Sequence, residues 1–438
     1  ISFDIFDQLT LFDEEEKERI NPFDWNSKST GFGEIMERGG FDVVIGNPPY
    51  IQLSMAEYFN NTVKKYLLSH FCSSMGRLNT FGFFIEKGID LLESHGIFGY
   101  IVPNTMVSQE YYQVLRKFIL KNTKINGISI YEESPFKEAV VENVTVILEK
   151  EKDNSKRMEN KIIVERFFNE KSISHSLPQK LLEYTYKNIF PTSLTQNFLS
   201  LYEKMTINKL LLNEIVNINQ AIALKQDRTK SIFLYPKNNN FKKLLDGRDI
   251  NRYLINWPGN YLLYNKSRIH SCKREDIFLA PEKILFRRVG RNIIATYDNE
   301  KYYALNTLVV ITLKPEITFS LKYILAILNS KLISFYFVKF LKSSKKIFSE
   351  IQARKFSQLP IHTINFNKPE EKSMHDKMVD LVNKMLELNK KKAALPPSSK
   401  RDKIEREIQI TDEKIDELVY ELYGITEEER KIIENTSS

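Results

Sequence analysis

Residues 47–50, Asn-Pro-Pro-Tyr, place an amide oxygen, two proline carbonyls and an aromatic ring side by side. The prolines fix φ and lack N–H donors, so their carbonyls stay available as acceptors. The Asn47 oxygen and a proline carbonyl could accept both hydrogens of an exocyclic amine while Tyr50 stacks on its ring. Such an amine is a poor nucleophile because its lone pair is delocalised, and two preset acceptors would free that pair. An ordinary proline turn is the alternative interpretation.

The segment before this motif, residues 41–46, has the composition of a short strand buried on both faces. Open α/β sheets bind ligands just beyond the carboxyl ends of their strands, so Asn47 would stand at a ligand site. A strand that leads directly into Asn-Pro-Pro-Tyr therefore favours a site over a turn.

Residues 47–50 match the catalytic motif of the S-adenosylmethionine-dependent adenine-N6 DNA methyltransferases. Residues 39–46 resemble the type IIG restriction–modification branch, which has a TaqI-type target-recognition domain. The resemblance implies methyl transfer from S-adenosyl-L-methionine to one adenine in a specific double-stranded DNA sequence. It also implies that Asn47 and the Pro48 carbonyl hold the amino group, that Tyr50 stacks on the flipped base, and that Pro49 borders the cofactor. Related tetrapeptides serve amines of RNA and of protein glutamine, which remain alternatives.

Two further stretches resemble motifs of the same family. Residues 81–87 look like the motif in which an aromatic residue, here Phe84, lines the cofactor pocket. Residues 133–139, followed by the apolar run 144–148, resemble the motif in which an aromatic residue, here Phe136, faces the base opposite Tyr50. Packing in the core is the alternative interpretation of both phenylalanines.

The segments around these motifs alternate between helix and strand. Helices are predicted near residues 56–70, 80–94 and 108–121, and strands at 97–102, 125–131 and 144–148. The alternation predicts an α/β fold that forms the second half of a doubly wound, Rossmann-like methyltransferase sheet. The family's glycine-rich cofactor motif does not precede the Asn-Pro-Pro-Tyr strand, and the chain opens on Ile1. We therefore expect a C-terminal fragment that lacks the first half of the sheet.

We expect three domains. Residues 1–155 would be the C-terminal half of the methyltransferase domain, residues 156–365 a mixed α+β recognition domain, and residues 366–438 an antiparallel helical hairpin. In the hairpin, apolar residues recur at spacings of 4 and 3 on both sides of a Pro-Pro turn at Pro396. The hairpin is expected to brace the recognition domain; a dimer seam or a partner surface is the alternative.

The positive charge of the chain is concentrated in its middle. Residues 151–365 carry 36 basic and 18 acidic side chains, whereas the whole chain has a net charge of only +8. This asymmetry predicts a surface for double-stranded DNA and binding that weakens as salt rises. It also favours DNA over RNA or protein as the substrate. A solvated lysine-rich surface is the alternative.

Six arginines of this segment are candidate DNA contacts. Some would grip phosphates and a minority could read guanine edges. A surface salt bridge is the alternative for each of them, and the six are Arg228, Arg248, Arg252, Arg287, Arg288 and Arg291.

Other features set expectations about cofactors and location. Cys72 and Cys272 form no pairing pattern and no secretory signal is visible, so we expect reduced thiols in a bacterial cytoplasmic protein. The six histidines show no ligand spacing, so we expect no metal. Residues 321–338 are interrupted by polar side chains and predict a core helix rather than a membrane span.

The expected assembly is a monomer bound to DNA. We find no nuclease constellation, and if the parent enzyme cuts DNA, that domain would lie upstream of Ile1. A second hypothesis is that the chain is a DNA-binding specificity module without activity of its own, because half of the cofactor pocket would be missing.

Overall fold

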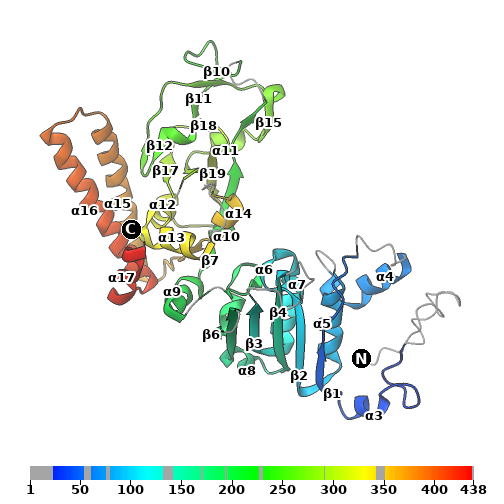
Figure 1. Ribbon diagram of the computed structural model, residues 1–438. Helices are drawn as coiled ribbons and strands as arrows, with labels where there is room; N and C mark the ends of the chain where they lie inside the picture. Colours follow the sequence, from blue (N-terminus) through cyan, green and yellow to red (C-terminus); the bar gives the residue numbers. More distant parts are fainter. Residues whose placement is uncertain are drawn as a thin grey trace. The chain divides into compact units, whose positions relative to one another are not determined.

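The computed structural model describes residues 23–53, 61–74, 79–131, 142–168, 171–192, 194, 196–225, 230–290, 292–341 and 351–436. The chain divides into two compact units, unit 1 up to Ser200 and unit 2 from Leu201 onward (Figure 1). Each unit has its own sheets, helices and core.

Unit 1 is built on one mixed sheet. Its strands are β1 (Phe41–Gly46), β2 (Leu92–Pro103), β3 (Thr123–Tyr131), β4 (Asn143–Lys150), β5 (Lys161–Phe168) and β6 (Lys171–Pro178). Its helices and helical turns are α3 (Gly33–Glu37), α4 (Asn61–His70), η2 (Cys72–Ser74), α5 (Thr80–Asp90), α6 (Thr105–Ser108), η3 (Glu110–Tyr112), α7 (Gln113–Asn122), α8 (Asn154–Glu159), η4 (Gln179–Glu183) and η5 (Tyr186–Asn188); α9 (Gln196–Thr206) crosses into unit 2. The strand order is β1-β2-β4-β3-β5-β6. β1 runs parallel to β2 and β3 to β5, whereas the other neighbours are antiparallel.

Helix α5 supplies much of the core of unit 1. Phe81, Ile85 and Ile89 recur at intervals of four residues and are buried, which is the spacing of one helix face. The Asn79 side chain accepts a hydrogen bond from the Phe81 N–H at 3.4 Å and so caps the start of the helix. The predicted helix is thus present, with its start set by this cap.

The junction between α5 and β2 differs from the prediction of a helix to residue 94. β2 already begins at Leu92, because the Phe41 N–H donates to the Leu91 carbonyl at 2.9 Å and Phe41 pairs with Leu92. Pairing with β1 therefore extends the strand back through His95, which adopts a φ of 67°. A tertiary contact, absent from the local sequence pattern, ends the helix early.

Strand β1 lies where the sequence predicts it, but the prediction that it is buried on both faces is wrong for the described structure. Val43 and Ile45 are 58% and 83% exposed. β1 is at the edge of the sheet and has β2 as its one neighbour among the described strands. Apolar strands of this kind are normally covered on both faces, so this edge presents an unusual apolar surface.

The predicted domain boundary at residue 155 cuts the sheet. β5 and β6 follow that boundary, yet Ile163 pairs with Gly127 of β3 and the whole of β6 pairs with β5. The chain instead divides after Ser200, and residues 366–438 belong to unit 2. The hydrophilic stretch before β5 is a connection within unit 1, which includes helix α8.

Unit 2 is a mixed unit of short strands and helices. Its strands are β7 (Leu210–Leu211), β8 (Val216–Gln220), β9 (Ala223–Leu224), β10 (Ile232–Phe233), β11 (Phe241–Leu245), β12 (Ile250–Asn251), β13 (Leu254–Ile255), β14 (Tyr261–Leu263), β15 (Ile269–Ser271), β16 (Lys283–Arg287), β17 (Ala295–Asp298), β18 (Tyr303–Ala304), β19 (Leu308–Leu313) and β20 (Pro360–Ile361). Its helices and helical turns are α10 (Leu212–Ile215), η6 (Gly247–Asp249), η7 (Lys266–Arg268), α11 (Asp276–Leu279), α12 (Leu321–Asn329), α13 (Lys331–Tyr336), η8 (Phe337–Leu341), α14 (Ala353–Phe356), α15 (Pro369–Ala393), α16 (Ser399–Tyr423) and α17 (Glu427–Thr436). Two four-stranded sheets, β10-β14-β11-β18 and β17-β16-β19-β8, form its centre.

Helix α12 is a core element of unit 2. Eight of its nine residues are buried, and the helix packs against β16 and β17. In the part of the chain that the structure describes, no single helix is long and apolar enough to cross a membrane. Helix α12 and the helical segment Lys331–Leu341 together have the length and apolar composition of a membrane span, but they are bent by 59° at the break between them.

Helices α15 and α16 lie side by side, and each is 25 residues long (Figure 1). Lys392 near the end of α15 forms an ion pair with Glu405 in the first turns of α16 at 2.6 Å. Gly424 ends α16 in the left-handed conformation at φ 64°. The buried residues of the pair include Met378, Val382 and Val419, so the apolar positions face packed protein.

Candidate active site and nucleic-acid surface

The Asn-Pro-Pro-Tyr motif follows β1 directly and is fixed to the start of α5 by Thr80. The Thr80 hydroxyl donates to the Pro49 carbonyl at 2.5 Å and accepts from the Ile51 N–H at 3.1 Å. The Thr80 N–H donates to the Ile51 carbonyl at 2.9 Å. Because Thr80 is buried, these three bonds hold the backbone after the motif against the helix.

Tyr50 connects the motif to the neighbouring strand. Its hydroxyl lies 3.0 Å from the Asn47 Oδ1 and 2.9 Å from the Ile101 carbonyl of β2. A phenol has one hydrogen to donate, so a bond to one acceptor leaves the other open. The Tyr50 ring packs edge-on against Phe81 with centroids 6.2 Å apart, and burial raises the pKa of its hydroxyl. The phenol therefore stays protonated at neutral pH.

Two acceptors of the motif are available for a ligand. Asn47 is exposed at the tip of β1, so nothing in the described structure encloses its amide. Pro48 is buried, yet no described residue donates a hydrogen bond to its carbonyl. A carbonyl is a strong acceptor, and one that no described residue bonds can accept from a ligand donor. The Pro49 carbonyl is already taken by Thr80.

Phe84 lies on the exposed side of α5, one turn after Thr80. Its side chain is 46% exposed, whereas its neighbours Phe83 and Ile85 are buried. The alternative interpretation of Phe84, packing in the core, is therefore wrong, because the buried face of α5 carries Phe81 and Ile85 instead. Residues four apart share a helix face, so Phe84 and Thr80 flank the same side of the helix start. Phe136, the second predicted base contact, lies outside the described residues.

Comparison with known protein families gives two separate matches. Residues 1–136 match the family described as Eco57I restriction-modification methylase, and residues 242–361 match the TaqI-like C-terminal specificity domain. The chain therefore contains a region similar to the Eco57I methylase family, followed by a region similar to the TaqI-like specificity domain. The predicted resemblance to restriction–modification methyltransferases with a TaqI-type recognition domain is thereby confirmed.

Individual relatives match over most of the chain. It is 27% identical over 428 residues to RM.MjaORFECS2P of Methanocaldococcus jannaschii, whose name joins a type II restriction enzyme with a methyltransferase. That match covers 93% of this chain and 33% of the relative, so the chain spans about a third of the relative's length. The type II methyltransferase M.HincII of Haemophilus influenzae is 22% identical over 422 residues, which cover 84% of this chain and 82% of the relative.

Among solved structures, the chain is similar to the type IIL restriction-modification enzyme MmeI, determined in complex with DNA. The TM-score is 0.41 at 11% sequence identity, and the match covers 88% of this chain and 54% of MmeI.

In the TaqI-like region, Arg252 has a structural role instead of the predicted DNA contact. Its guanidinium forms a two-pronged ion pair with Asp412 of α16, at 2.9 and 2.7 Å, and also donates to the Asn329 carbonyl at 2.8 Å. These bonds tie the segment that follows β12 to α16 and to the end of α12. Because both terminal nitrogens of the guanidinium already donate hydrogen bonds, few donors remain for a phosphate or a guanine.

The other candidate arginines differ in how free they are. Arg248, in the turn η6, is exposed and makes no hydrogen bond or ion pair with a described residue. Arg287 donates to the Ile250 carbonyl and Arg288 to the Asn306 carbonyl, so both are partly committed to the fold. Arg228 and Arg291 lie outside the described residues. Arg248 is therefore the best DNA-contact candidate among the four described arginines.

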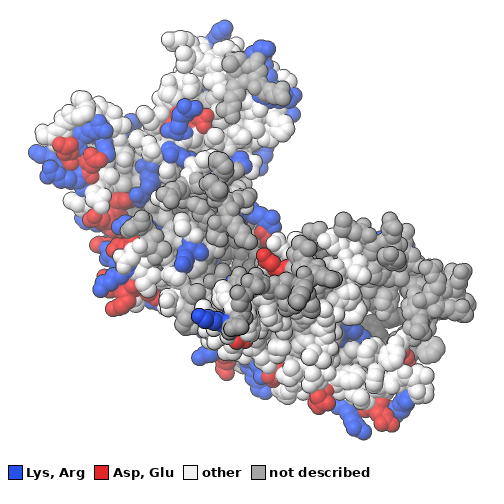
Figure 2. Space-filling model, viewed as in Figure 1, with Lys and Arg blue, Asp and Glu red and all other residues white. Residues whose placement is uncertain are grey.

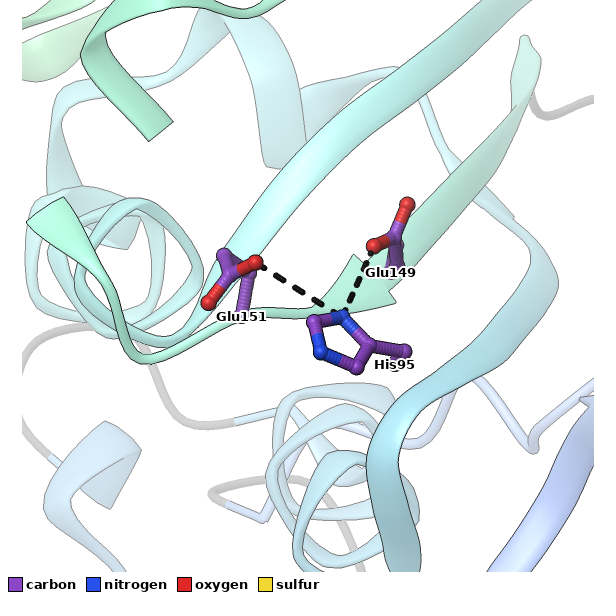
Figure 3. A group of neighbouring side chains, drawn as sticks. All are labelled: His95, Glu149 and Glu151. Carbon is purple, nitrogen blue, oxygen red and sulfur yellow. Dashed lines mark hydrogen bonds and ion pairs between the residues drawn. The ribbon is translucent and has the colours of Figure 1, made fainter. Parts of the chain in front are cut away.

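His95, Glu149 and Glu151 form a cluster at the end of the sheet where β2 begins and β4 ends (Figure 3). The His95 Nδ1 lies 3.2 Å from Glu149 and 3.6 Å from Glu151. Burial acts to raise the pKa of Glu149, but hydrogen bonds from Lys124 and His95 outweigh it and lower that pKa. Because Lys124 and Lys156 already pair with the two carboxylates, we assign an ion-pair network rather than a metal site.

Two groups of the candidate site were missed by reasoning from the sequence. Thr80 had a detectable signal, since Asn79-Thr80 has the composition of a helix start, but its contact with Pro49 joins segments 31 residues apart. The Ile101 carbonyl, which competes for the Tyr50 hydroxyl, is a backbone group 51 residues away. Backbone acceptors carry no sequence signal at all.

Proposed function

We propose that this chain is the DNA adenine-N6 methyltransferase portion of a type IIG restriction–modification enzyme. It would act on a flipped-out adenine, with the TaqI-like region reading the site. The single observation that carries the proposal is a pair of acceptors beside the Tyr50 ring. The Asn47 amide oxygen shares the Tyr50 hydroxyl with the Ile101 carbonyl, and the Pro48 carbonyl has no donor among the described residues. The family matches supply the restriction–modification context.

The motif would hold the base through its amino group. Asn47 Oδ1 and the Pro48 carbonyl would each accept one N6 hydrogen, which turns the nitrogen lone pair out of conjugation with the ring. Tyr50 would shift its hydroxyl bond to the Ile101 carbonyl and so release Asn47, because both acceptors are already within reach. The Tyr50 ring would then stack on the flipped adenine, with Phe136 proposed on its other face.

S-adenosylmethionine would bind next to the motif, on the side where Pro49 and Phe84 lie. Pro49 is exposed, and Phe84 presents apolar surface one helical turn after the Thr80 contact with Pro49. Pro49 and Phe84 would border the cofactor, which would supply the methyl group when bound. Thr80 would keep Pro49 and Phe84 in a fixed relative position, since it links the Pro49 carbonyl to the helix that carries Phe84.

A second candidate function is a DNA-binding specificity module without activity of its own. The open edge of β1 favours it, because Val43 and Ile45 are exposed on a strand type that is normally covered. The chain also spans about a third of its M. jannaschii relative. In this reading, another polypeptide segment would cover β1 and complete the cofactor pocket.

Calorimetric titration with S-adenosylmethionine separates the two functions. Binding by the chain supports the methyltransferase, and absence of binding with intact duplex affinity supports the specificity module. Transfer of a tritiated methyl group to long mixed-sequence DNA then tests the site itself. Asn47→Ala should abolish transfer while leaving duplex affinity within a few fold. Asn104→Ala is the matched control, since Asn104 follows the neighbouring parallel strand β2 and should leave transfer intact.

If Asn47→Ala lost duplex affinity and methyl transfer to the same extent, Asn47 would serve folding or DNA binding rather than chemistry. If Asn104→Ala abolished transfer equally, the test would have measured damage to this end of the sheet. Either result would refute the proposed role of the motif.

A further inference from the structure

The loop at residues 234–240, named here the apex loop, joins β10 to β11 at the top of unit 2 in Figure 1. All of its residues are exposed. Leu234 is 64% and Tyr235 79% exposed, so two large apolar side chains stand next to each other in solvent. Isolated exposed apolar residues are common, but adjacent ones at a loop tip mark interaction sites.

The ends of the apex loop are held firmly. The Phe233 ring packs edge-on against Phe241 with centroids 5.2 Å apart, and Phe233 pairs with Tyr261 of β14. At the other end, the Phe241 N–H donates to the Asn238 carbonyl at 3.1 Å and the Tyr264 N–H donates to the Asn240 carbonyl at 3.0 Å. A loop fixed at both ends loses less conformational entropy when it binds.

The surroundings of the apex loop are basic. Residues 230–245 contain four lysines and no acidic residue, the lysines being Lys230, Lys237, Lys242 and Lys243. The Lys237 Nζ lies 5.8 Å from the centre of the Phe233 ring, at the base of the loop. On the face shown in Figure 2, basic side chains mark this end of unit 2. The loop lies directly before residues 242–361, which match the TaqI-like specificity domain, and outside that match.

We propose that the apex loop is a DNA-contacting wedge in which Tyr235, supported by Leu234, packs against base faces of duplex DNA. The inference rests on the proposed function, in that duplex DNA is the substrate. Phosphates attract lysines and can accept a bond from a tyrosine hydroxyl, but they give nothing to a leucine side chain or to the face of a tyrosine ring. Apolar side chains gain instead by entering a partly unstacked base step, preferably a flexible pyrimidine–purine step. Lys237 and Lys242, to which the described residues offer no ion pair, then neutralise the flanking phosphates, whereas Lys243 is already paired with Glu300 at 3.4 Å.

If the apex loop is a wedge, loss of its aromatic ring and loss of a lysine charge should change DNA binding in different ways. Tyr235→Ala should weaken binding to a mixed-sequence duplex by a factor of roughly 5 to 100, because it removes a stacking ring. Its dependence on salt should be unchanged, since no charge is lost. Tyr235→Phe should bind like wild type. Lys237→Ala should instead lower the slope of log K against log salt by about 1. All variants are compared by fluorescence anisotropy over a salt series.

A base analogue reports on insertion directly. 2-Aminopurine beside pyrimidine–purine steps should brighten on addition of wild type or Tyr235→Phe, because it loses stacking, and should stay dim with Tyr235→Ala. Ile410→Ala is the matched control, since it removes an apolar side chain that is 52% exposed on α16. It should behave like wild type. Unchanged melting temperatures confirm that each variant is folded.

The outcomes separate this inference from the proposed function. If Tyr235→Ala binds and brightens the analogue like wild type, the wedge is refuted while DNA methylation stands. If Tyr235→Ala lowers the salt slope instead, the loop contacts phosphates only and the wedge is again refuted. If the wild-type chain does not bind duplex DNA, both proposals fail together.

Discussion

Thr80→Val tests whether one hydroxyl holds the Asn-Pro-Pro-Tyr motif in place. The substitution keeps the shape of the side chain but deletes the donor to the Pro49 carbonyl and the acceptor for the Ile51 N–H. Each such bond contributes about 1 kcal/mol net, and a partly buried N–H left without an acceptor adds to the loss. The bond from the Thr80 N–H to the Ile51 carbonyl remains. We expect the local opening free energy of residues 47–53 to fall by about 1–3 kcal/mol.

Amide hydrogen exchange measures this quantity at the site. Exchange in peptides that cover residues 47–53 should accelerate by a factor of about 5 to 100, while exchange in β3 and β4 stays as in wild type. Thr145→Val is the matched control, because Thr145 hydrogen-bonds the Tyr131 hydroxyl at 2.9 Å in the same sheet. It should leave residues 47–53 protected. Equal protection in Thr80→Val and wild type would show that the motif is held by something other than this hydroxyl.

Four further predictions concern single side chains. Burial raises the pKa of Asp416 from 3.8 to about 6, so its contribution to the free energy of unfolding falls as pH rises through that interval. Asp416→Asn should remove this dependence and raise stability at neutral pH by about 1–3 kcal/mol, seen in melting temperature against pH. Arg252→Lys should lower stability by about 1–3 kcal/mol without changing duplex affinity, whereas Arg248→Ala should weaken duplex binding and reduce its salt slope by about 1. Tyr50→Phe should cost about 0.5–1.5 kcal/mol and retain methyl transfer in the tritium assay, but Tyr50→Ala should lose it.

The sequence was informative wherever a local pattern determined the structure. The strand before the motif, the start of α5 and most of β3 and β4 follow from apolar runs, helical spacing and a capping Asn79. The burial of β1 could not be obtained this way. An apolar strand has the same sequence pattern whether or not its faces are covered, and Ile45 is exposed because no described residue covers its side of β1.

Long-range pairing accounts for the rest of the difference. In the sequence, Arg252 is one basic residue within a basic segment. Its partner Asp412 lies 160 positions away, on a helix of a different predicted domain. β5 and β6 follow a hydrophilic stretch that looks like a linker, yet they complete the sheet of unit 1. Charge counts and composition are sums over a segment. They do not show which individual charged side chain is already paired with another residue of the fold.

That distinction between committed and available polar groups is what separates function from structure in this chain. Arg116 is buried and its guanidinium is bonded to the Met106 and Lys187 carbonyls, so it serves the fold. At the tip of β1, by contrast, the Tyr50 hydroxyl has one hydrogen for two acceptors, the Asn47 amide oxygen and the Ile101 carbonyl. The Pro48 carbonyl has no donor among the described residues. A fold optimised for stability alone would pair these oxygens, because unpaired ones are costly. An amine with two hydrogens is the simplest partner that could bond the Asn47 amide oxygen and the Pro48 carbonyl at once. Adenine carries such an amine on a flat ring.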